Sequence, residues 1–209
     1  MNFEKQTIQL FLDELASDAP APGGGSVAAL GGALGAALAT MVVNLTVGRE
    51  KYKEHWDAMA GARDKSEPMR KRFVDLMNED TEAFNAYMAA MKLPKETDGE
   101  KAARRSAMEE ASKGATKIPL ETLELCVSLA EVARTAMQHG NTNAASDAGV
   151  AALYAQAAGK AAALNVRINL PSIKDEAFAA EVRNRMTRAL DALAKLCRET
   201  EDGMDRLLG

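Results

Sequence analysis

The stretch APAPGGGSVAALGGALGAALATMVVNLTVG, residues 19–48, decides the fold because it contains no charged residue. Its many Ala residues favour a helix, since Ala has the highest helix propensity. A run of this length can span a bilayer, but it holds few Leu, Ile or Phe residues and ends with Asn44 and Thr46. A helix that is apolar on all sides can instead form the centre of a bundle. We therefore predict a buried central helix and no membrane association, with a membrane span as the alternative.

The chain of 209 residues has the size of one domain, and we predict a single helical domain over residues 1–209. Its residues are 47% hydrophobic but only 4% aromatic, which disfavours an all-β fold. A net charge of −4 gives no footprint for nucleic acid. Cys126 and Cys197 cannot build a disulfide framework and we see no secretory signal, so we expect a cytoplasmic protein. His55 and His139 lie far apart in sequence without Cys neighbours, so we expect no metal site.

Apolar spacing and breaker residues predict the other elements of the fold. Apolar residues three and four positions apart, ended by Pro or Gly, predict helices at about residues 3–17, 53–91, 97–116, 119–140, 142–164 and 173–206. The helix in the uncharged run is expected to use Ser26 as its N-cap and to reach about Val47. The 142–164 helix is also nearly uncharged. We therefore predict an all-α, up-and-down bundle with two buried apolar central helices, which also suit a dimer interface.

Asp80 stands where the pattern of its helix demands an apolar side chain. It lies between Leu76 and Ala83 in a seam with alternating spacings of four and three. A carboxylate there is buried unless a cleft reaches it, and burial raises its pKa toward the range of a general acid or base. The alternative is a surface acid, since Asn78 and Glu79 are also polar. Buried unpaired acids are rare, so we favour a functional role.

Asp147 is a second acid at the edge of an apolar segment. It lies near the start of the 142–164 helix, directly after Ser146. The helix dipole stabilises an acid in a first turn, and this is the structural alternative. The polar sequence Gly140-Asn141 nearby keeps a functional role open as well.

Other polar residues also stand near the ends of the apolar helices. Asn44, Asn165 and Asn169 can bind a ligand, be satisfied by a neighbouring helix or form a turn, because buried amides need partners. The basic sequence from Arg49 to Lys53, which includes Lys51 and Tyr52, is either a solvated helix end or an anion anchor. The Gly23–Ser26 sequence is either a turn or a nest of backbone N–H groups that receives an anion at a helix start.

Helix geometry limits which of these residues can meet. Ser26 and Asn44 lie on one helix face, but a straight helix separates them by roughly 27 Å. They can share a pocket only if a second subunit contributes or if the glycines break the helix.

No Walker loop, dinucleotide-binding fingerprint, nucleophile elbow or Cys/His metal spacing occurs in the sequence. A series of short motifs covering nearly the whole chain nevertheless resembles the cyclodeaminase/cyclohydrolase family, which includes the C-terminal domain of formiminotransferase-cyclodeaminase and bacterial methenyltetrahydrofolate cyclohydrolases. These motifs are Pro22-Gly-Gly-Gly-Ser26, Met41-Val-Val-Asn-Leu-Thr46 with Gly48-Arg-Glu-Lys-Tyr52, Asp80 with Ala83-Phe84, Leu93-Pro94-Lys95, Ile118-Pro119-Leu120, Gly140-Asn141 with Ser146-Asp147-Ala148-Gly149, and Asn165-Val166 with Ile168-Asn169-Leu170.

The resemblance implies an all-helical, homodimeric, cytoplasmic protein that acts on a tetrahydrofolate derivative, with no prosthetic group or metal. In that chemistry the expected catalytic residues are Asp80 as base or cation stabiliser, Asp147 as the second carboxylate, and Lys51 as the rival acid/base. The residues expected to meet the pterin edge are Asn44, Asn141, Asn165 and Asn169, with Tyr52 beside Lys51. The residues expected near the glutamate tail are Gly23, Gly24, Gly25, Ser26, Arg49 and Lys95.

The resemblance leaves three functions open. We favour the cyclohydrolase, because the chain stands alone and its length and residues 95–104 look like the bacterial cyclohydrolases. The alternatives are a formiminotetrahydrofolate cyclodeaminase, which closes the ring with loss of ammonia, and a helical module that binds folate without catalysis.

Overall fold

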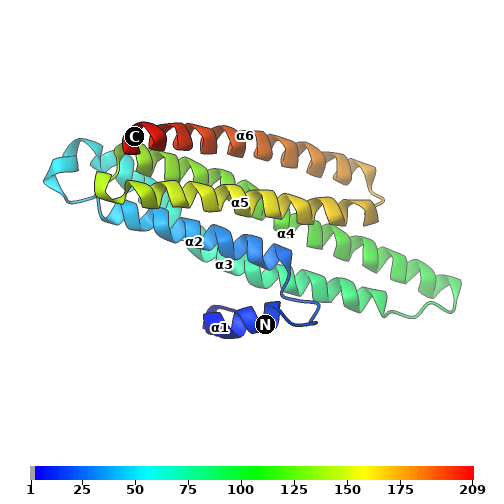
Figure 1. Ribbon diagram of the computed structural model, residues 1–209. Helices are drawn as coiled ribbons and strands as arrows, with labels where there is room; N and C mark the ends of the chain where they lie inside the picture. Colours follow the sequence, from blue (N-terminus) through cyan, green and yellow to red (C-terminus); the bar gives the residue numbers. More distant parts are fainter. Residues whose placement is uncertain (1–2) are drawn as a thin grey trace.

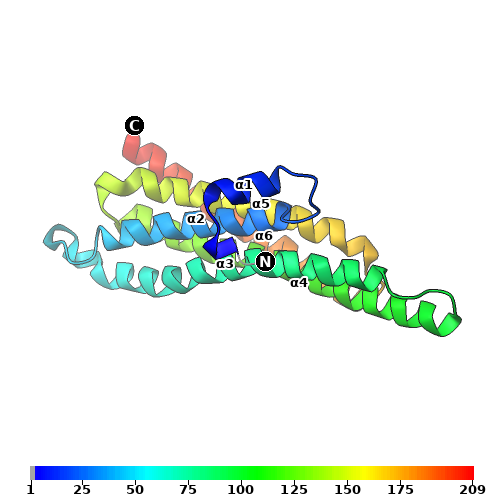
Figure 2. The same ribbon diagram turned by 90° about the horizontal axis from the view of Figure 1, so that it is seen from below.

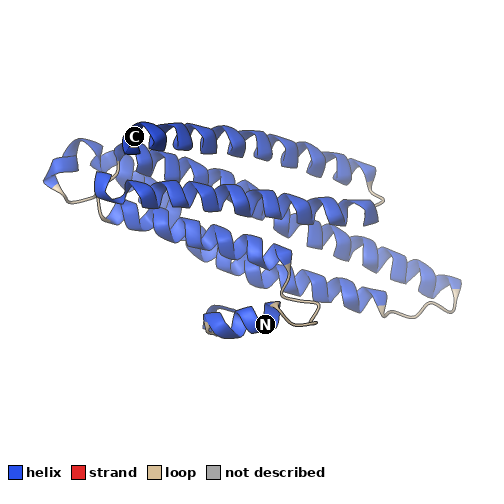
Figure 3. Ribbon diagram, in the orientation of Figure 1, coloured by secondary structure: helices blue, strands red, loops and turns tan. Residues whose placement is uncertain are grey.

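The computed structural model describes residues 3–209, and every regular element in that part of the chain is helical (Figure 3). The α-helices are α1 (Ile8–Leu15), α2 (Gly24–Asn44), α3 (Trp56–Met91), α4 (Asp98–His139), α5 (Ala145–Asn169) and α6 (Glu176–Leu208). The 3-10 turns are η1 (Phe3–Lys5), η2 (Glu50–His55), η3 (Thr142–Ala144) and η4 (Leu170–Ser172). Helices α2 to α6 run alternately up and down a bundle (Figure 1). The predicted all-α bundle is confirmed.

Small residues allow the helices of this bundle to approach closely. The buried residues form one hydrophobic cluster that draws on α2, α3, α4, α5 and α6. At Gly32 of α2, a side chain would collide with the fully buried ring of Phe73 in α3. The Ala- and Gly-rich composition therefore sets the helix spacing, because interiors are packed at crystal-like density.

Helices α2 and α5 are not enclosed on all sides, which differs from the expected pair of fully buried helices. One face of each packs in the core, while the other carries apolar side chains with high exposed fractions, such as Leu34 at 46%, Leu153 at 53% and Ile168 at 76%. By length and composition alone, α2 could also cross a membrane, and 61% of its most apolar window is buried inside the protein. The apolar surface that sequence analysis assigned to a core is thus partly exposed in the single chain.

The ends of several helices differ from the predicted ones. Gly23, not Ser26, is the N-cap of α2, and α2 ends at Asn44. The predicted helices over 97–116 and 119–140 are one helix, α4, which contains Pro119. A capping box formed by Thr97 and Glu100 stabilises the start of α4. Helix α5 continues to Asn169, so its last residues are helical rather than a connection.

A side chain from α5 explains how α4 continues through Pro119. A proline inside a helix has no N–H to donate to the carbonyl four residues earlier, which here belongs to Ala115. Asn169 donates its Nδ2 to that Ala115 oxygen at 2.9 Å. The orphaned acceptor is therefore satisfied from a neighbouring helix, which sequence periodicity could not reveal.

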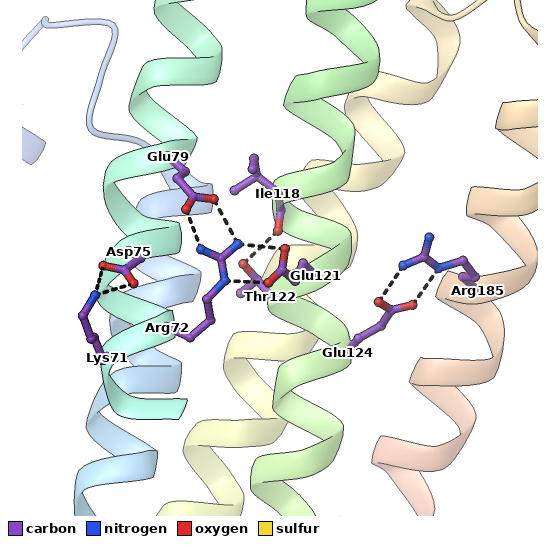
Figure 4. A network of polar contacts seen from close by, with 9 residues as sticks. All are labelled: Lys71, Arg72, Asp75, Glu79, Ile118, Glu121, Thr122, Glu124 and Arg185. Atoms are coloured by element: carbon purple, nitrogen blue, oxygen red, sulfur yellow. Dashed lines mark hydrogen bonds and ion pairs between the residues drawn. The ribbon is translucent and has the colours of Figure 1, made fainter. Parts of the chain in front are cut away.

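Ion pairs on the bundle surface tie α3 to α4 and α4 to α6 (Figure 4). Arg72 lies between Glu79 and Glu121, donating to Glu121 Oε1 at 2.6 Å, and these two carboxylates raise its pKa. Arg185 of α6 pairs with Glu124 of α4 at 2.8 Å. Helix α1 lies beside the bundle (Figure 2), where the Phe3 N–H donates to Asn78 of α3.

Candidate functional site

A cavity of about 400 Å³ lies at the N-terminal end of α2, where the loop before it meets α3, α4 and α5. Asp80 is the only charged side chain among the described residues that line it. The lining residues are Pro20, Ala21, Gly23, Gly24, Gly25, Asp80, Thr81, Phe84, Tyr87, Ser112, Ala115, Asn165, Ile168, Asn169 and Ser172. A walled space with one anionic group and a few amides and hydroxyls has the composition of a small-molecule site.

Asp80 is held against the first turn of α2. Ser26 donates its hydroxyl to Asp80 Oδ2 at 2.9 Å, and the Ser26 backbone N–H is a second donor. Burial raises the pKa of the Asp80 carboxyl, while the two Ser26 hydrogen bonds act in the opposite direction. Because burial is the largest cause, the pKa lies above that of an ordinary Asp, in the direction that suits a general base.

Gly25 is required by the position of this carboxylate. A side chain built on Gly25 would collide with the Asp80 carboxylate. The anion that lies at the glycine-rich helix start in this structure is thus the protein's own Asp80. Ser26 is fully buried, with an exposed fraction of 0%, and does not line the cavity. Its predicted contact with substrate does not match this position.

Three adjacent polar residues of α3 turn to three different partners. Asn78 accepts the Phe3 N–H, Glu79 pairs with Arg72 (Figure 4), and Asp80 meets Ser26. The alternative view of all three as one solvated polar face is therefore wrong for Asp80. Among these three residues, the spacing of the apolar seam identified Asp80, which is the one that lines the cavity.

Asn165 and Asn169 line the opposite wall from α5, one helical turn apart. Asn165 donates its Nδ2 to the Ala161 carbonyl at 3.0 Å, and Asn169 donates to the Ala115 carbonyl at 2.9 Å. These two bonds fix the amide orientations, and each Oδ1 and the second hydrogen of each Nδ2 are left for a ligand. The predicted pair of amides therefore lies at the cavity and carries both acceptors and donors.

The aromatic wall of the cavity was missed by sequence analysis as a site. Phe84 and Tyr87 line the cavity from α3, four and seven residues after Asp80. Their spacing puts them on the helix face that carries Asp80, so the same seam that identified Asp80 could have identified them. Thr81, Ser112 and Ser172 also line the cavity, and no distinct sequence signal marked them.

A second group of predicted residues lies at the other end of α2, around η2 and the start of α5. Tyr52 is buried and donates its hydroxyl to Asn141 Oδ1 at 3.1 Å, while the Thr142 N–H donates to the Tyr52 hydroxyl at 3.2 Å. Asn141 also donates to Leu45 O at 3.2 Å and, through its N–H, to Thr46 Oγ1 at 2.8 Å. Hydrogen bonds with Thr142, assisted by Lys51, lower the pKa of Tyr52. We call this the Tyr52 cluster, comprising Asn44, Arg49, Lys51, Tyr52, Asn141 and Asp147.

The charged members of the Tyr52 cluster are open to solvent. Arg49 and Lys51 are exposed, and Asp147 is half-buried in the first turn of α5. The Lys51 Nζ lies 5.1 Å from the centroid of the Tyr52 ring. Asn44 is the exposed last residue of α2. Lys95 belongs to neither site, because it is exposed in the connection between α3 and α4.

The two sites lie at opposite ends of an unbroken helix. Helix α2 has 21 residues, which corresponds to a length of about 30 Å. Asp80 therefore does not share a cavity with Asp147 or Lys51 within one chain, and the glycines do not break α2. Near the Tyr52 cluster, the rings of His55 and His139 lie 4.8 Å apart despite their distance in sequence.

Together, fold and cavity define a class of helical-bundle proteins with a buried carboxylate in a pocket between helices. The family model for formiminotransferase-cyclodeaminase matches residues 7–188. A methenyltetrahydrofolate cyclohydrolase from Methylorubrum extorquens is 48% identical over 84% of this chain and 85% of its own length. The chain belongs to the formiminotransferase-cyclodeaminase family, and the resemblance of its motifs is confirmed.

Two further relatives support this family membership. The formimidoyltransferase-cyclodeaminase of Sus scrofa is 39% identical over 88% of this chain, which corresponds to 34% of that longer protein. The crystal structure of formiminotetrahydrofolate cyclodeaminase from Thermotoga maritima superposes with a TM-score of 0.89 at 28% identity and covers 99% of both chains.

Proposed function

We propose that this protein is a methenyltetrahydrofolate cyclohydrolase that hydrolyses 5,10-methenyltetrahydrofolate to 10-formyltetrahydrofolate. The carrying observation is the cavity in which Asp80 is the only charged side chain among the described lining residues. The methenyl carbon bridges N5 and N10 as a cationic amidinium, so a lone anion in a partly desolvated cavity complements it. The cyclohydrolase of Methylorubrum extorquens, similar over most of both chains, supports the same choice.

Asp80 is suited to the first step of this reaction. A water molecule adds its oxygen to the methenyl carbon and loses a proton to the carboxylate. The carbon–N5 bond then breaks, N5 takes up a proton, and the remaining hydroxyl loses its proton as the formyl C=O forms on N10. One proton is released overall, and the reaction needs no metal or prosthetic group. The pKa of Asp80, raised by burial, makes the carboxylate a better proton acceptor than an ordinary Asp.

The walls of the cavity suit a flat bicyclic ring. Phe84 and Tyr87 offer apolar surface, while Asn165 and Asn169 each donate one Nδ2 hydrogen to a backbone carbonyl. The free amide oxygens are acceptors, matching the amino and ring N–H donors of the pterin edge. In this proposal Asn165 and Asn169 orient the pterin, and Asp80 faces the methenyl carbon.

We further propose that the enzyme is a cytoplasmic homodimer whose subunits pair through the exposed apolar faces of α2 and α5. On α2 the exposed residues Val27, Leu34 and Met41 recur every seven positions, and on α5 they include Leu153 and Ile168. A continuous apolar stripe of this kind is unfavourable in water, and isologous two-fold pairing covers the same stripe on both subunits.

An antiparallel pairing about a two-fold axis would also unite the two sites. Leu34 lies midway between Gly24 and Asn44 in the sequence, and Gln156 lies midway between Asp147 and Asn165. These two midpoints are nearly level, because the α2 residues around Leu34 pack against Tyr154 and Ala158 of α5.

An axis at this level would bring Asn44 of the partner subunit toward Gly24, and Asp147 of the partner subunit toward Asn165. The Asp80 cavity would then gain the amide, the second carboxylate and the cations of the partner's Tyr52 cluster. Lys51 of the partner subunit is, in this proposal, the group that protonates the departing nitrogen or anchors the glutamate tail.

The second candidate is formiminotetrahydrofolate cyclodeaminase, in which N10 attacks the formimino carbon and ammonia leaves. It is favoured by the close superposition on the Thermotoga maritima enzyme. Both reactions centre on the same carbon between N5 and N10 and both use a base and an acid, so the cavity suits either.

An ultraviolet assay of the methenyl band separates the candidates. Decay of the band after mixing protein with 5,10-methenyltetrahydrofolate, faster than in buffer, supports the cyclohydrolase. Growth of the band from 5-formiminotetrahydrofolate, with release of ammonia, supports the cyclodeaminase. Binding without either change supports a non-catalytic folate-binding module and contradicts both enzymatic proposals.

A further inference from the structure

Ser26 links the start of α2 to Asp80 without reaching the cavity. Its hydroxyl donates to Asp80 Oδ2 at 2.9 Å and lies 3.4 Å from the Thr81 hydroxyl. Ser26 and Thr81 are both buried, with exposed fractions of 0% and 2%. Such a fully buried hydroxyl cannot contact a ligand unless the helix moves, so any effect on a ligand passes through its neighbours Asp80 and Thr81.

We propose that Ser26 is a positioning residue for Asp80: its hydroxyl and backbone N–H clamp the carboxylate against the first turn of α2, in the space that Gly25 leaves free. This inference rests on the proposed function, in which Asp80 is the base. It adds a role to the triple-glycine motif, because Gly25 supplies the room and Ser26 supplies the donors. In this proposal the triple-glycine motif holds the catalytic carboxylate in place, whereas the sequence suggested that the motif receives part of the substrate.

The surroundings of Asp80 leave this task to Ser26. Among the described residues, Asp80 is the only charged group lining the cavity, and Tyr87 is the only other titratable side chain there. Burial and the Ser26 bonds are the causes that set the pKa of Asp80. Hydrogen bonds to the charged form of a carboxylate lower its pKa. The Ser26 hydrogen bonds therefore oppose the effect of burial and favour the ionised form of Asp80.

The test compares two buried serines that link the same two helices. Ser26→Ala removes the hydroxyl of α2 that donates a hydrogen bond to Asp80 of α3. Ser66→Ala removes a fully buried hydroxyl of α3 that accepts a hydrogen bond from Thr40 of α2 at 2.9 Å, within the same helix pair but away from the cavity. Each variant loses one buried hydroxyl that links α2 to α3. If the role of Ser26 is purely structural, the two variants should lose similar thermal stability, and the titration of Asp80 should not differ between them.

The readouts are the Asp80 carboxyl titration, followed by carbon NMR in protein labelled at Asp, and the pH profile of turnover. Losing one hydrogen bond to a charged group corresponds to a shift of about 1 pH unit. In Ser26→Ala we expect the Asp80 pKa and the acidic limb of the profile to move upward by about this amount. Ser66→Ala should leave both at the wild-type pH, and Ser26→Thr, which keeps the hydroxyl, should restore most of the wild-type profile.

Failure of this inference is distinguishable from failure of the proposed function. If Ser26→Ala leaves the Asp80 titration unchanged, Ser26 does not position the carboxylate, whatever the activity of the enzyme. If Asp80→Asn keeps wild-type turnover, Asp80 is not the base, although the NMR titration still reports on its contact with Ser26. An equal shift in Ser66→Ala would show that loosened packing, not the Ser26 hydrogen bond, controls Asp80.

Discussion

The two ends of α2 satisfy their polar groups in opposite ways. At the N-terminal end, Ser26 is the only residue in the described part of the chain that hydrogen-bonds Asp80, and no cation in that part contributes to the pKa of Asp80. At the C-terminal end Tyr52 and Asn141 satisfy one another and the nearby backbone, while Lys51 is exposed. The N-terminal end thus holds a carboxylate in a walled cavity, whereas the other end carries the exposed cations Arg49 and Lys51 together with the half-buried Asp147. Charges separated by the length of α2 can meet only between two chains, which is the electrostatic basis for the proposed antiparallel dimer.

The largest expected effect is at the carboxylate of the N-terminal end. Asp80→Asn keeps the size of the side chain and removes the proton acceptor, so turnover should fall about 10³-fold, as for the loss of a general base. The measurement is the decay of the methenyl band under saturating substrate. Glu79→Gln is the matched control, because this adjacent acid faces Arg72 and should keep turnover within about twofold. Equal losses in the two variants would mean that charge in general, not the cavity carboxylate, drives the reaction.

The next effect tests why the N-terminal end contains a glycine. Gly25→Ala forces a methyl group against the Asp80 carboxylate, so the carboxylate or the start of α2 must move. We expect turnover to fall at least 10²-fold, since misplacing a catalytic group by about 1 Å has effects of this size. Gly61→Ala serves as the comparison, because nothing lies within 4 Å of the added carbon. That substitution should raise helix stability by about 0.5–1 kcal/mol. Wild-type turnover in Gly25→Ala would contradict the fixed position of Asp80.

Separating the subunits tests whether the two ends of α2 from different chains form one site. Leu34→Arg places a charge in the middle of the exposed stripe of α2. We expect the protein to become a monomer by light scattering and to lose at least tenfold in turnover, because each cavity then lacks the partner's Tyr52 cluster. Leu93→Arg is the control, since Leu93 is equally apolar and 41% exposed but lies in the α3–α4 connection. A fully active Leu34→Arg monomer would overturn the shared site.

Sequence reasoning was reliable where one helix decides the outcome. The helical class followed from Ala content, and the seam that runs through Leu76 and Ala83 identified Asp80 as a cavity residue from its register alone. The start of α4 near residue 97 was also predictable, because the capping partners Thr97 and Glu100 lie within one turn.

Sequence reasoning failed where partners come from other helices. No local pattern reveals that Ser26 faces Asp80, because the two residues lie 54 positions apart in the sequence. The same limit applies to helix α4, whose continuation through Pro119 depends on Asn169 of α5. Two buried central helices that also suit a dimer interface were predicted, and in one chain α2 and α5 each keep an exposed apolar face.

The smallest expected effect concerns Asn169 in the wall of the cavity and separates the two roles of this residue. Asn169 both supports Ala115 O, freed by Pro119, and offers its Oδ1 to the cavity. Asn169→Ala should lower the free energy of unfolding by about 1 kcal/mol, because it leaves the partly buried Ala115 carbonyl without its hydrogen-bond partner. In a Pro119→Ala background the restored N–H can bond Ala115 O, so the same substitution should then be nearly neutral for stability. Urea unfolding of the four proteins of this double-mutant cycle measures the difference. The Michaelis constant for the folate substrate is measured for the same four proteins. If Asn169→Ala in the Pro119→Ala background no longer lowers stability but still raises the Michaelis constant, Asn169 contacts the substrate as well as the helix. If both effects disappear together, Asn169 only repairs the break at Pro119, and pterin recognition at the N-terminal end of α2 falls to Asn165.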